Sequence, residues 1–196
     1  MSDEERRRWD ERYATGEYRA RTWVTPFLEQ WLPHLGPGRA LVLACGPGRN
    51  ALYLAEYGFD VLGVDISEVA IGEARASAAE RGLEAEFVVA DLDDFELAQG
   101  TYDLITVIRY RNASLWPRLV QALAPNGWIL AEHHMKATAD VAGPTSPDFR
   151  LDPGELLEAF GALRIVHFSE KIEPAEDEVR AYAIQRAVAC NGDPGW

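Results

Sequence analysis

The sequence predicts one α/β domain built on an open, doubly wound sheet of seven strands, mostly parallel, with an antiparallel last strand and helices on both faces. Two observations predict this fold class. Apolar runs bounded by turn residues alternate with helical patterns along the chain, and this alternation indicates right-handed parallel crossovers. The chain has 196 residues, 47% of them hydrophobic and 26% charged, as expected for a single domain with one buried core.

Each predicted strand is a short apolar segment flanked by turn signals, and the segments span residues 40–44, 60–64, 84–89, 102–108, 127–132, 163–168 and 180–188. Helical segments separate most of them, at residues 49–57, 68–81, 115–123 and 153–160, with N-caps expected at Ser67, Ser114 and Asp152 and a stop at Gly82. Only a short polar connection joins the last two strands, so we expect the final strand to return as an antiparallel hairpin.

Composition restricts the classes of partner and compartment. Acidic side chains outnumber basic ones by 32 to 19, and the formal charge of -13 disfavours a nucleic-acid partner because it repels a polyanionic backbone. No apolar stretch is long enough to span a bilayer and the N-terminus is charged, so we expect a cytoplasmic protein without a membrane partner. Cys45 and Cys190 are the only cysteines, which predicts a reducing compartment with neither a disulfide framework nor a metal cluster. The oligomeric state stays open.

Residues 1–35 are predicted to form a helical segment ahead of the main domain at 36–196. Residues 4–12 are highly charged and typical of a short amphipathic helix, which Gly16 is expected to end. Pro26 then lies at the first position of a second helix, where its missing amide hydrogen costs nothing.

Chemistry-bearing residues follow the first three predicted strands, at the edge where ligands bind in an open parallel sheet. Gly46 and Gly48 let the backbone of a tight turn approach a ligand closely before a helix begins. Asp65 can accept both hydroxyl hydrogens of a ribose, and Asp91 can accept from an exocyclic amine such as that of adenine. Each residue has an ordinary alternative, as a ligand-free turn, a helix cap or a solvated surface acid. Their joint placement predicts a nucleoside site.

Together with the segments around them, these residues resemble the motifs of class I S-adenosylmethionine-dependent methyltransferases over nearly the whole chain. The matching segments are Leu43 to Asn50, Val64-Asp65-Ile66-Ser67, Val89-Ala90-Asp91-Leu92, Tyr102-Asp103-Leu104-Ile105 and Leu123-Ala124-Pro125-Asn126-Gly127. The opening Trp9-Asp10-Glu11-Arg12-Tyr13 and the Arg49-Asn50-Ala51 after the glycines are further similar to the small methyltransferases of the tellurite-resistance and thiopurine type. The resemblance implies a Rossmann-like fold, S-adenosylmethionine as cofactor and methyl transfer as the activity.

The resemblance also implies which residues hold the cofactor, and that the N-terminal segment, including Tyr13, folds over it as a lid spanning Trp9 to Trp23. The cofactor-binding candidates are Tyr13, Cys45, Gly46, Gly48, Asn50, Asp65, Ile66, Ala90, Asp91, Leu92 and Ile108. No metal ligand is expected among them.

For the transfer itself, the candidates are His133, His134, Tyr13 and Arg109, which include the residues after the fourth and fifth strands. A sulfonium is already a good leaving group, so the protein mainly aligns the acceptor with the methyl carbon. An oxygen or nitrogen acceptor can need a base, for which the histidines are placed, with Tyr13 and Arg109 as orienting groups. The alternative for the histidines is an ordinary strand-end pair, one ring hydrogen-bonded and the other exposed.

Two positions depart from the family pattern. Val42 stands where an acidic residue is usual, which removes an anchor for the methionine ammonium. Ala44 stands where a glycine is usual, which adds a methyl group near the closest backbone approach. The Asn-Pro-Pro-Tyr signature for attack by amines of nucleic acids or proteins is absent after the fourth strand, which favours a small-molecule acceptor of a chemical class that the sequence leaves open.

Two alternative functions remain at this stage. A nicotinamide-dependent oxidoreductase also uses a glycine turn and a ribose-binding acid, but Gly46-x-Gly48-x-x-Ala51 fits that fingerprint only with alanine at its third position. In addition, neither Lys136 nor Lys171 has a tyrosine four residues before it. The second alternative is a non-catalytic cofactor-binding protein, which is favoured by the two departures from the family pattern at Val42 and Ala44.

Overall fold

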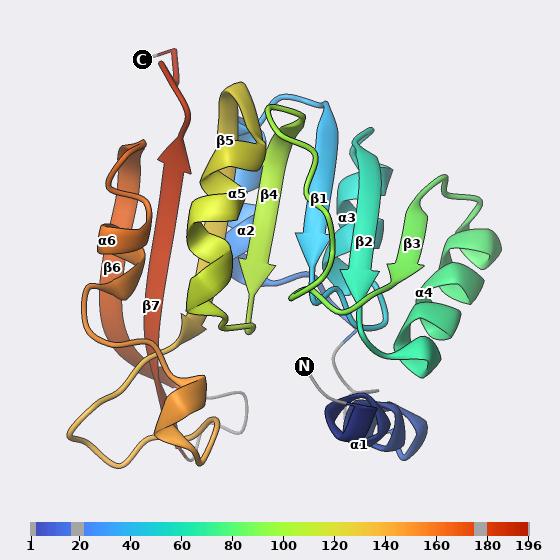
Figure 1. Ribbon diagram of the computed structural model, residues 1–196, viewed down its shortest axis with the longest axis horizontal. Coiled ribbons are helices and arrows are strands. Elements are labelled where there is room, and N and C mark those ends of the chain that lie inside the picture. Colours follow the sequence, from blue (N-terminus) through green and yellow to red (C-terminus); the bar gives the residue numbers. More distant parts are fainter. Residues whose placement is uncertain (1–2, 17–21, 175–179, 196) are drawn as a thin grey trace.

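A seven-stranded sheet in the order β3-β2-β1-β4-β5-β7-β6 organises the computed structural model, which describes residues 3–16, 22–174 and 180–195 (Figure 1). The strands are β1 (Arg39–Leu43), β2 (Asp60–Asp65), β3 (Glu86–Val89), β4 (Tyr102–Ile108), β5 (Leu123–His134), β6 (Arg164–Pro174) and β7 (Ala181–Cys190). β1 to β5 pair in parallel, whereas β7 is antiparallel to both β5 and β6. The predicted mostly parallel sheet with an antiparallel last strand is therefore confirmed.

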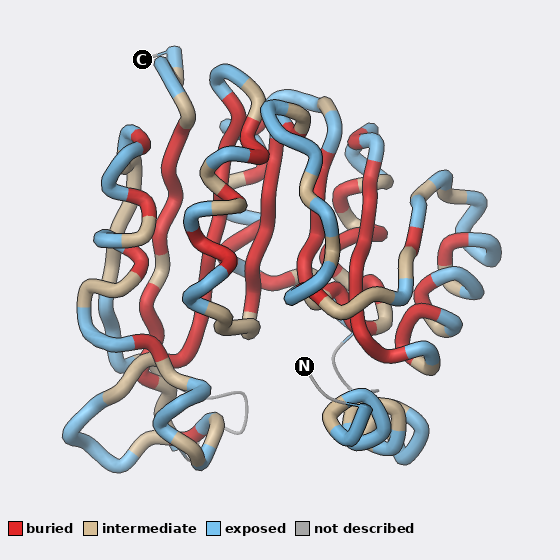
Figure 2. The backbone as a smooth tube through the Cα atoms, in the orientation of Figure 1, coloured by how far each residue is buried: buried red, intermediate tan, exposed pale blue. Residues whose placement is uncertain are grey.

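Helices cover both faces of this sheet, and each face has its own buried cluster. The helices are α1 (Asp3–Ala14), α2 (Pro26–Trp31), α3 (Arg49–Glu56), α4 (Glu68–Arg81), α5 (Trp116–Ala122) and α6 (Glu155–Ala159). Phe27, Leu54 and Ile71 bring α2, α3 and α4 into one cluster, and Leu119 and Leu156 bring α5 and α6 into the other. Figure 2 shows β1, β2, β4, β5 and β7 as the buried centre between these layers. Burial of each such side chain contributes about 1.5–3 kcal/mol.

The boundaries of α4 follow directly from its local sequence. The hydroxyl oxygen of Ser67 accepts a hydrogen bond from the backbone N of Ala70 at 3.1 Å, which satisfies one of the amides at the start of the helix. Gly82 ends α4 in the left-handed conformation, with φ of 64°. Both predicted boundary residues are therefore confirmed.

The boundaries predicted for α5 and α6 are wrong by a few residues. The side-chain oxygen of Asn112 accepts from the backbone N of Ser114, so a 3-10 turn forms first and α5 starts only after Leu115. Gly154, with φ of 78°, precedes α6 in place of Asp152, because the left-handed turn it allows brings the chain into the helix later.

The strand order reverses between β1 and β4, and ligands of doubly wound sheets bind beyond the carboxyl ends of the strands at such a switch point. Figure 1 shows α1 and the connection from β5 to α6 beyond this edge of the sheet. No residue of α1 is buried, whereas α2 contributes Phe27 and Leu28 to the core. The two helices of the predicted segment 1–35 therefore differ, and residues 17–21 of the predicted lid lie outside the described residues.

Over the described ranges, no helix combines the length and the apolar character that crossing a bilayer requires. The same ranges contain no group of three or more His, Cys, Asp or Glu side chains arranged to hold a metal ion.

Candidate active site

The connection from β1 to α3 is a tight turn in which three residues adopt left-handed backbone angles. The φ angle is 46° at Ala44, 54° at Gly46 and 89° at Gly48. A Cβ atom on Gly48 would lie 3.0 Å from the Cβ of Ala74 in α4, so this glycine also permits the turn to pack closely on that helix. The turn expected at Gly46 and Gly48 is therefore present, directly before α3.

Both departures from the family pattern have structural consequences. A left-handed conformation costs a residue with a Cβ atom roughly 1–2 kcal/mol, and Ala44 carries this strain where a glycine would not. The side chain of Val42 is 2% exposed and packs in the core cluster with Leu104 and Leu130. Position 42 thus contributes to the core and offers no charge to a ligand.

Asp65 ends β2, and its carboxylate holds two loops together. Its Oδ2 accepts from the backbone N of Gly46 at 2.8 Å, and its Oδ1 accepts from the backbone N of Ser67 at 2.9 Å. The residue is 5% exposed, and burial raises the pKa of Asp65, although these amide hydrogen bonds oppose the rise. A carboxylate has about four lone-pair positions, so further donors can still bind here.

The loops after β2 and β3 lie side by side at this edge of the sheet. The backbone N of Ala90 donates to the carbonyl of Asp65 at 2.9 Å. Arg118 of α5 donates to the carbonyl of Leu92 at 3.3 Å and so fixes the loop that begins with Asp91. The structure therefore brings Asp65, Ala90, Asp91 and Leu92 together, as the sequence predicts.

The other residues predicted to bind the cofactor are buried in or near the turn. Burial raises the pKa of the Cys45 thiol, so this cysteine stays protonated and packs in the turn. The side-chain oxygen of Asn50 accepts from the backbone N of Thr25 at 2.9 Å, which ties α3 to the start of α2. Ile66 and Ile108 are 6% and 8% exposed and follow or end their strands at the same edge.

Tyr13 reaches the glycine turn from α1. A Cβ atom on Gly46 would lie 2.9 Å from the Tyr13 hydroxyl oxygen, so the phenol lies directly against the turn. Trp9 stacks on Tyr13 with ring centres 6.0 Å apart, and the guanidinium carbon of Arg12 lies 5.1 Å from the centre of the Trp9 ring. One face of α1 thus carries an aromatic group to the predicted cofactor site.

Arg109 follows β4 and contacts the end of β5 through both backbone and side chain. Its φ angle is 61°, and its backbone N donates to the carbonyl of Glu132 at 2.8 Å. Its Nη2 lies 3.2 Å from Glu132 Oε1, and its Nη1 lies 2.8 Å from Nε2 of His134. Because a guanidinium can only donate, that imidazole nitrogen accepts. Two of the predicted catalytic candidates, Arg109 and His134, are therefore in contact.

Glu132 is the buried centre of an ion-pair cluster on this face of the sheet. It is 2% exposed, and its Oε2 accepts from Nε of Arg186 at 2.6 Å. Arg186 also donates from Nη1 to Oε2 of Glu173 at 2.7 Å. The sequence gives no signal for Arg186, because it lies 54 positions from Glu132 and reaches it only when β7 pairs with β5.

His133 points to the face of β5 opposite to His134, since successive side chains of a strand alternate. Its Nε2 lies 2.8 Å from the carbonyl oxygen of Phe149 and must donate to it, which leaves Nδ1 as an acceptor. This Nδ1 is buried without a hydrogen-bond partner among the described residues. Burial lowers the pKa of His133 to about 4, so the ring is neutral at physiological pH and is a weak base.

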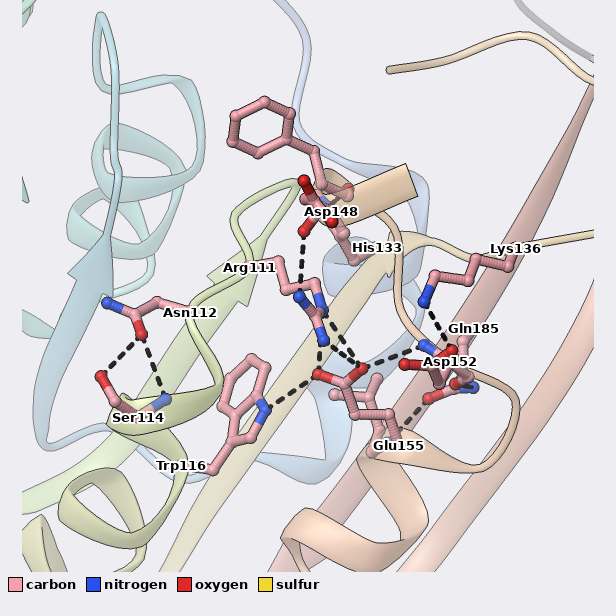
Figure 3. A network of polar contacts seen from close by, with 12 residues as sticks. Arg111, Asn112, Ser114, Trp116, His133, Lys136, Asp148, Asp152, Glu155 and Gln185 are labelled. Carbon is pink, nitrogen blue, oxygen red and sulfur yellow. Dashed lines mark hydrogen bonds and ion pairs between the residues drawn. The ribbon is translucent and has the colours of Figure 1, made fainter. Parts of the chain in front are cut away.

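A second ion pair fixes the connection between β5 and α6 (Figure 3). Nη2 of Arg111 lies 2.8 Å from Oε2 of Glu155, and Nη1 donates to the carbonyl of Asp148 at 2.9 Å. The indole Nε1 of Trp116 donates to Oε1 of Glu155 at 3.3 Å. This network holds the loop whose carbonyl orients His133, and the sequence does not reveal Glu155 because it lies 44 positions from Arg111.

Comparisons with known proteins match part of this chain to a family. Residues 40–127 match a family model described as a methyltransferase domain. The crystal structure of TehB from Haemophilus influenzae superposes with a TM-score of 0.74 at 22% identity, covering 92% of this chain and 66% of that chain.

Two relatives match shorter stretches. Ribosomal RNA small subunit methyltransferase C of Alcanivorax borkumensis is 30% identical over 111 residues, which are 50% of this chain and 34% of that protein. Thiopurine S-methyltransferase of Pseudomonas fluorescens is 41% identical over 51 residues, which are 24% of this chain and 23% of that protein. The chain thus matches about a third or less of the length of these two relatives.

The matched region contains the features from which the site is built. It includes the glycine turn, Asp65 at the end of β2 and Asp91 after β3. The likeness to TehB shows the same fold. The resemblance to class I S-adenosylmethionine-dependent methyltransferases that the motifs show is therefore confirmed over residues 40–127, and the chain has the same fold as TehB.

Proposed function

We propose that this chain is an S-adenosylmethionine-dependent methyltransferase that acts on a small-molecule acceptor. The observation that carries the proposal is the buried carboxylate of Asp65 at the switch point of the sheet, with its two oxygens oriented by the amides of Gly46 and Ser67. A carboxylate fixed in this way has lone pairs left to accept two ribose hydroxyls. When bound, the cofactor would supply a methyl group on a sulfonium, whose sulfur leaves readily as a neutral thioether when the acceptor takes the methyl.

In this proposal the loops after β1, β2 and β3 bind the nucleoside. Asp65 accepts from the ribose, Asp91 accepts from the exocyclic amine, and Leu92 lies beside Asp91 as a buried apolar side chain. Tyr13 covers the glycine turn, so α1 excludes water from this end of the site. We assign the lid to α1, which buries no residue, whereas α2 follows the predicted lid and belongs to the core.

The acceptor site in this proposal lies at the ends of β4 and β5. His133 orients a donor group of the acceptor through Nδ1, which has no hydrogen-bond partner among the described residues. It does not remove a proton from the acceptor, because its lowered pKa makes it a weak base. Arg109 and His134 lie on the opposite face of β5 as a preformed pair, and Tyr13 lies against the glycine turn that follows β1, the strand next to β4. A soft nucleophile such as a thiol does not need a strong base, so the histidines at these strand ends suffice for it.

The small-molecule acceptor is supported by the net charge of -13 and by the name of the thiopurine relative. The same charge and the cysteine usage support a cytoplasmic protein that does not bind nucleic acid. The ribosomal RNA relative makes nucleic acid the competing acceptor. Tight, salt-dependent RNA binding in a gel-shift assay contradicts the small-molecule proposal.

A thermal-shift comparison of S-adenosylmethionine, S-adenosylhomocysteine and NAD tests the cofactor. We expect both sulfur nucleosides to raise the melting temperature and NAD to leave it unchanged. A shift with NAD alone favours an oxidoreductase. Val42 and Ala44 favour a non-catalytic binding protein as the second candidate, and methyl transfer from labelled cofactor to any member of a panel of thiols, phenols and amines excludes it.

A further inference from the structure

Helix α1 lies beyond the carboxyl ends of the strands and has no buried residue (Figure 1). A helix that buries no side chain gains little from the hydrophobic effect. Its main contact with another described helix or strand is with α4, and Tyr13 also lies against the glycine turn, so the polar interactions with α4 contribute to holding α1 in place.

Asp10 makes a polar contact between α1 and the start of α4. Its Oδ1 accepts from the hydroxyl of Ser67 at 2.6 Å and from the backbone N of Val69 at 3.3 Å. Val69 belongs to the first turn of α4, where amides have no partner within the helix and the helix dipole favours a negative charge. Asp10 therefore stabilises the docked position of α1.

Ser67 connects this contact to the predicted ribose site. Its backbone N donates to Oδ1 of Asp65 at 2.9 Å, while its hydroxyl oxygen accepts from the backbone N of Ala70. A hydroxyl has one hydrogen, and Asp10 accepts it, so the docking of α1 fixes the orientation of Ser67.

We propose that Asp10 is a positioning residue that couples the docking of α1 to cofactor binding at Asp65. α1 contacts the partners of both carboxylate oxygens of Asp65, since Tyr13 lies against Gly46 and Asp10 binds Ser67. The coupling is reciprocal, so cofactor binding strengthens α1 docking by the factor by which docking strengthens cofactor binding. The inference rests on the proposed function, because it requires a cofactor held by Asp65.

Calorimetry with S-adenosylhomocysteine on the full chain tests the coupling. We expect Asp10→Ala to weaken binding by about 5- to 20-fold. Asp10→Asn keeps an oxygen acceptor for the Ser67 hydroxyl and is expected to restore part of the affinity. The matched control is Glu11→Ala, which removes an exposed carboxylate from the next position of the same helix and should leave the affinity unchanged.

Two further measurements separate coupling from a general loss of structure. If Asp10 acts through Ser67, then Asp10→Ala weakens binding clearly less in a Ser67→Ala background than in the unsubstituted chain. Amide exchange over residues 3–14 should slow when S-adenosylhomocysteine binds the unsubstituted chain and slow much less in Asp10→Ala.

The outcomes distinguish this inference from the proposed function. Unchanged affinity in folded Asp10→Ala, or an equal loss with and without Ser67, overturns the coupling and leaves the proposed function intact. Failure of the unsubstituted chain to bind either S-adenosylmethionine or S-adenosylhomocysteine overturns the proposed function and, with it, the coupling.

Discussion

At the ends of β1 to β3, backbone amides and one carboxylate hold the proposed cofactor site, whereas at the ends of β4 and β5, partly buried ion pairs hold the proposed acceptor site. We call the ends of β1 to β3 the cofactor half of the site and the ends of β4 and β5 the acceptor half. In the cofactor half, the Asp65 carboxylate accepts from the amide of Gly46, 19 positions away. In the acceptor half, Arg111 binds Glu155, 44 positions away, and both partners are charged. The two halves therefore depend on side-chain identity to very different degrees.

This difference predicts how each half responds to substitution. A hydrogen bond from a backbone amide persists when neighbouring side chains change. The turn from β1 to α3 is therefore retained although Val42 and Ala44 depart from the family pattern. A buried ion pair requires both partners, because removal of one leaves the other unpaired in a medium of low polarity. We therefore expect the large changes in stability from substitutions in the acceptor half, and changes mainly in cofactor affinity, with only small changes in stability, from those in the cofactor half.

Glu132→Ala should have the largest effect. It removes the carboxylate shared by Arg109 and Arg186, and we expect a loss of about 3 kcal/mol in the free energy of unfolding, measured by urea denaturation. The control Glu158→Ala removes an exposed glutamate from α6 and should change stability by less than about 0.5 kcal/mol. Equal, small losses in both variants contradict the proposed dependence on ion pairs.

His133 should make stability depend on pH in a definite direction. Its pKa is about 4 in the folded chain, below the ordinary 6.5, so between these values the unfolded chain binds more protons. Stability due to this residue therefore rises with pH from about 4 to about 6.5 and is constant above, and it falls by roughly 2–3 kcal/mol from pH 7 to pH 4.5.

Denaturation at a series of pH values tests this expectation through His133→Gln, which can still donate to the Phe149 carbonyl but does not titrate. The variant should lose that part of the pH dependence, whereas His34→Gln at an exposed position should keep it. Parallel pH profiles for the unsubstituted chain and His133→Gln are incompatible with a neutral, buried His133.

The cofactor half was largely predictable from sequence for a geometric reason. The carboxyl ends of parallel strands meet at one edge of the sheet, so once the apolar runs are assigned to strands, the residues after each run are neighbours in space. Gly46, Asp65 and Asp91 follow consecutive runs in this way, and the loops that carry them are joined by hydrogen bonds in the structure. The local signals of Ser67 and Gly82 likewise fixed α4.

The acceptor half was not predictable to the same extent, because its contacts depend on how long connections return to the sheet. Charged residues make up 26% of the chain, so nothing in the sequence marks Glu155 or Arg186 as the partner of another charge. The opposite orientations of His133 and His134 follow from the register of β5 with β4 and β7, which the apolar pattern alone does not specify.

Asp65→Ala tests the cofactor half. It removes the proposed acceptor of the ribose hydroxyls, and we expect affinity for S-adenosylhomocysteine to fall by about 2 kcal/mol, given the strength of hydrogen bonds to charged groups. Calorimetry measures the affinity, and denaturation of the same variant reports its stability separately. Asp60→Ala, at the exposed start of the same strand, is the control and should bind normally. Unchanged affinity in a folded Asp65→Ala protein removes this assignment.

The smallest expected effect is a gain from Ala44→Gly. The left-handed angle of 46° costs alanine roughly 1–2 kcal/mol, and the greater freedom of glycine in the unfolded chain offsets about 0.5–1 kcal/mol of that cost. We therefore expect the free energy of unfolding to rise by about 0.5–1 kcal/mol, seen as a higher urea midpoint with an unchanged slope. The control is Ala139→Gly in an exposed loop, where φ is not positive and glycine should only destabilise. If Ala44→Gly instead loses stability as the control does, the turn is not strained, and the contrast between a tolerant cofactor half and a demanding acceptor half needs another explanation.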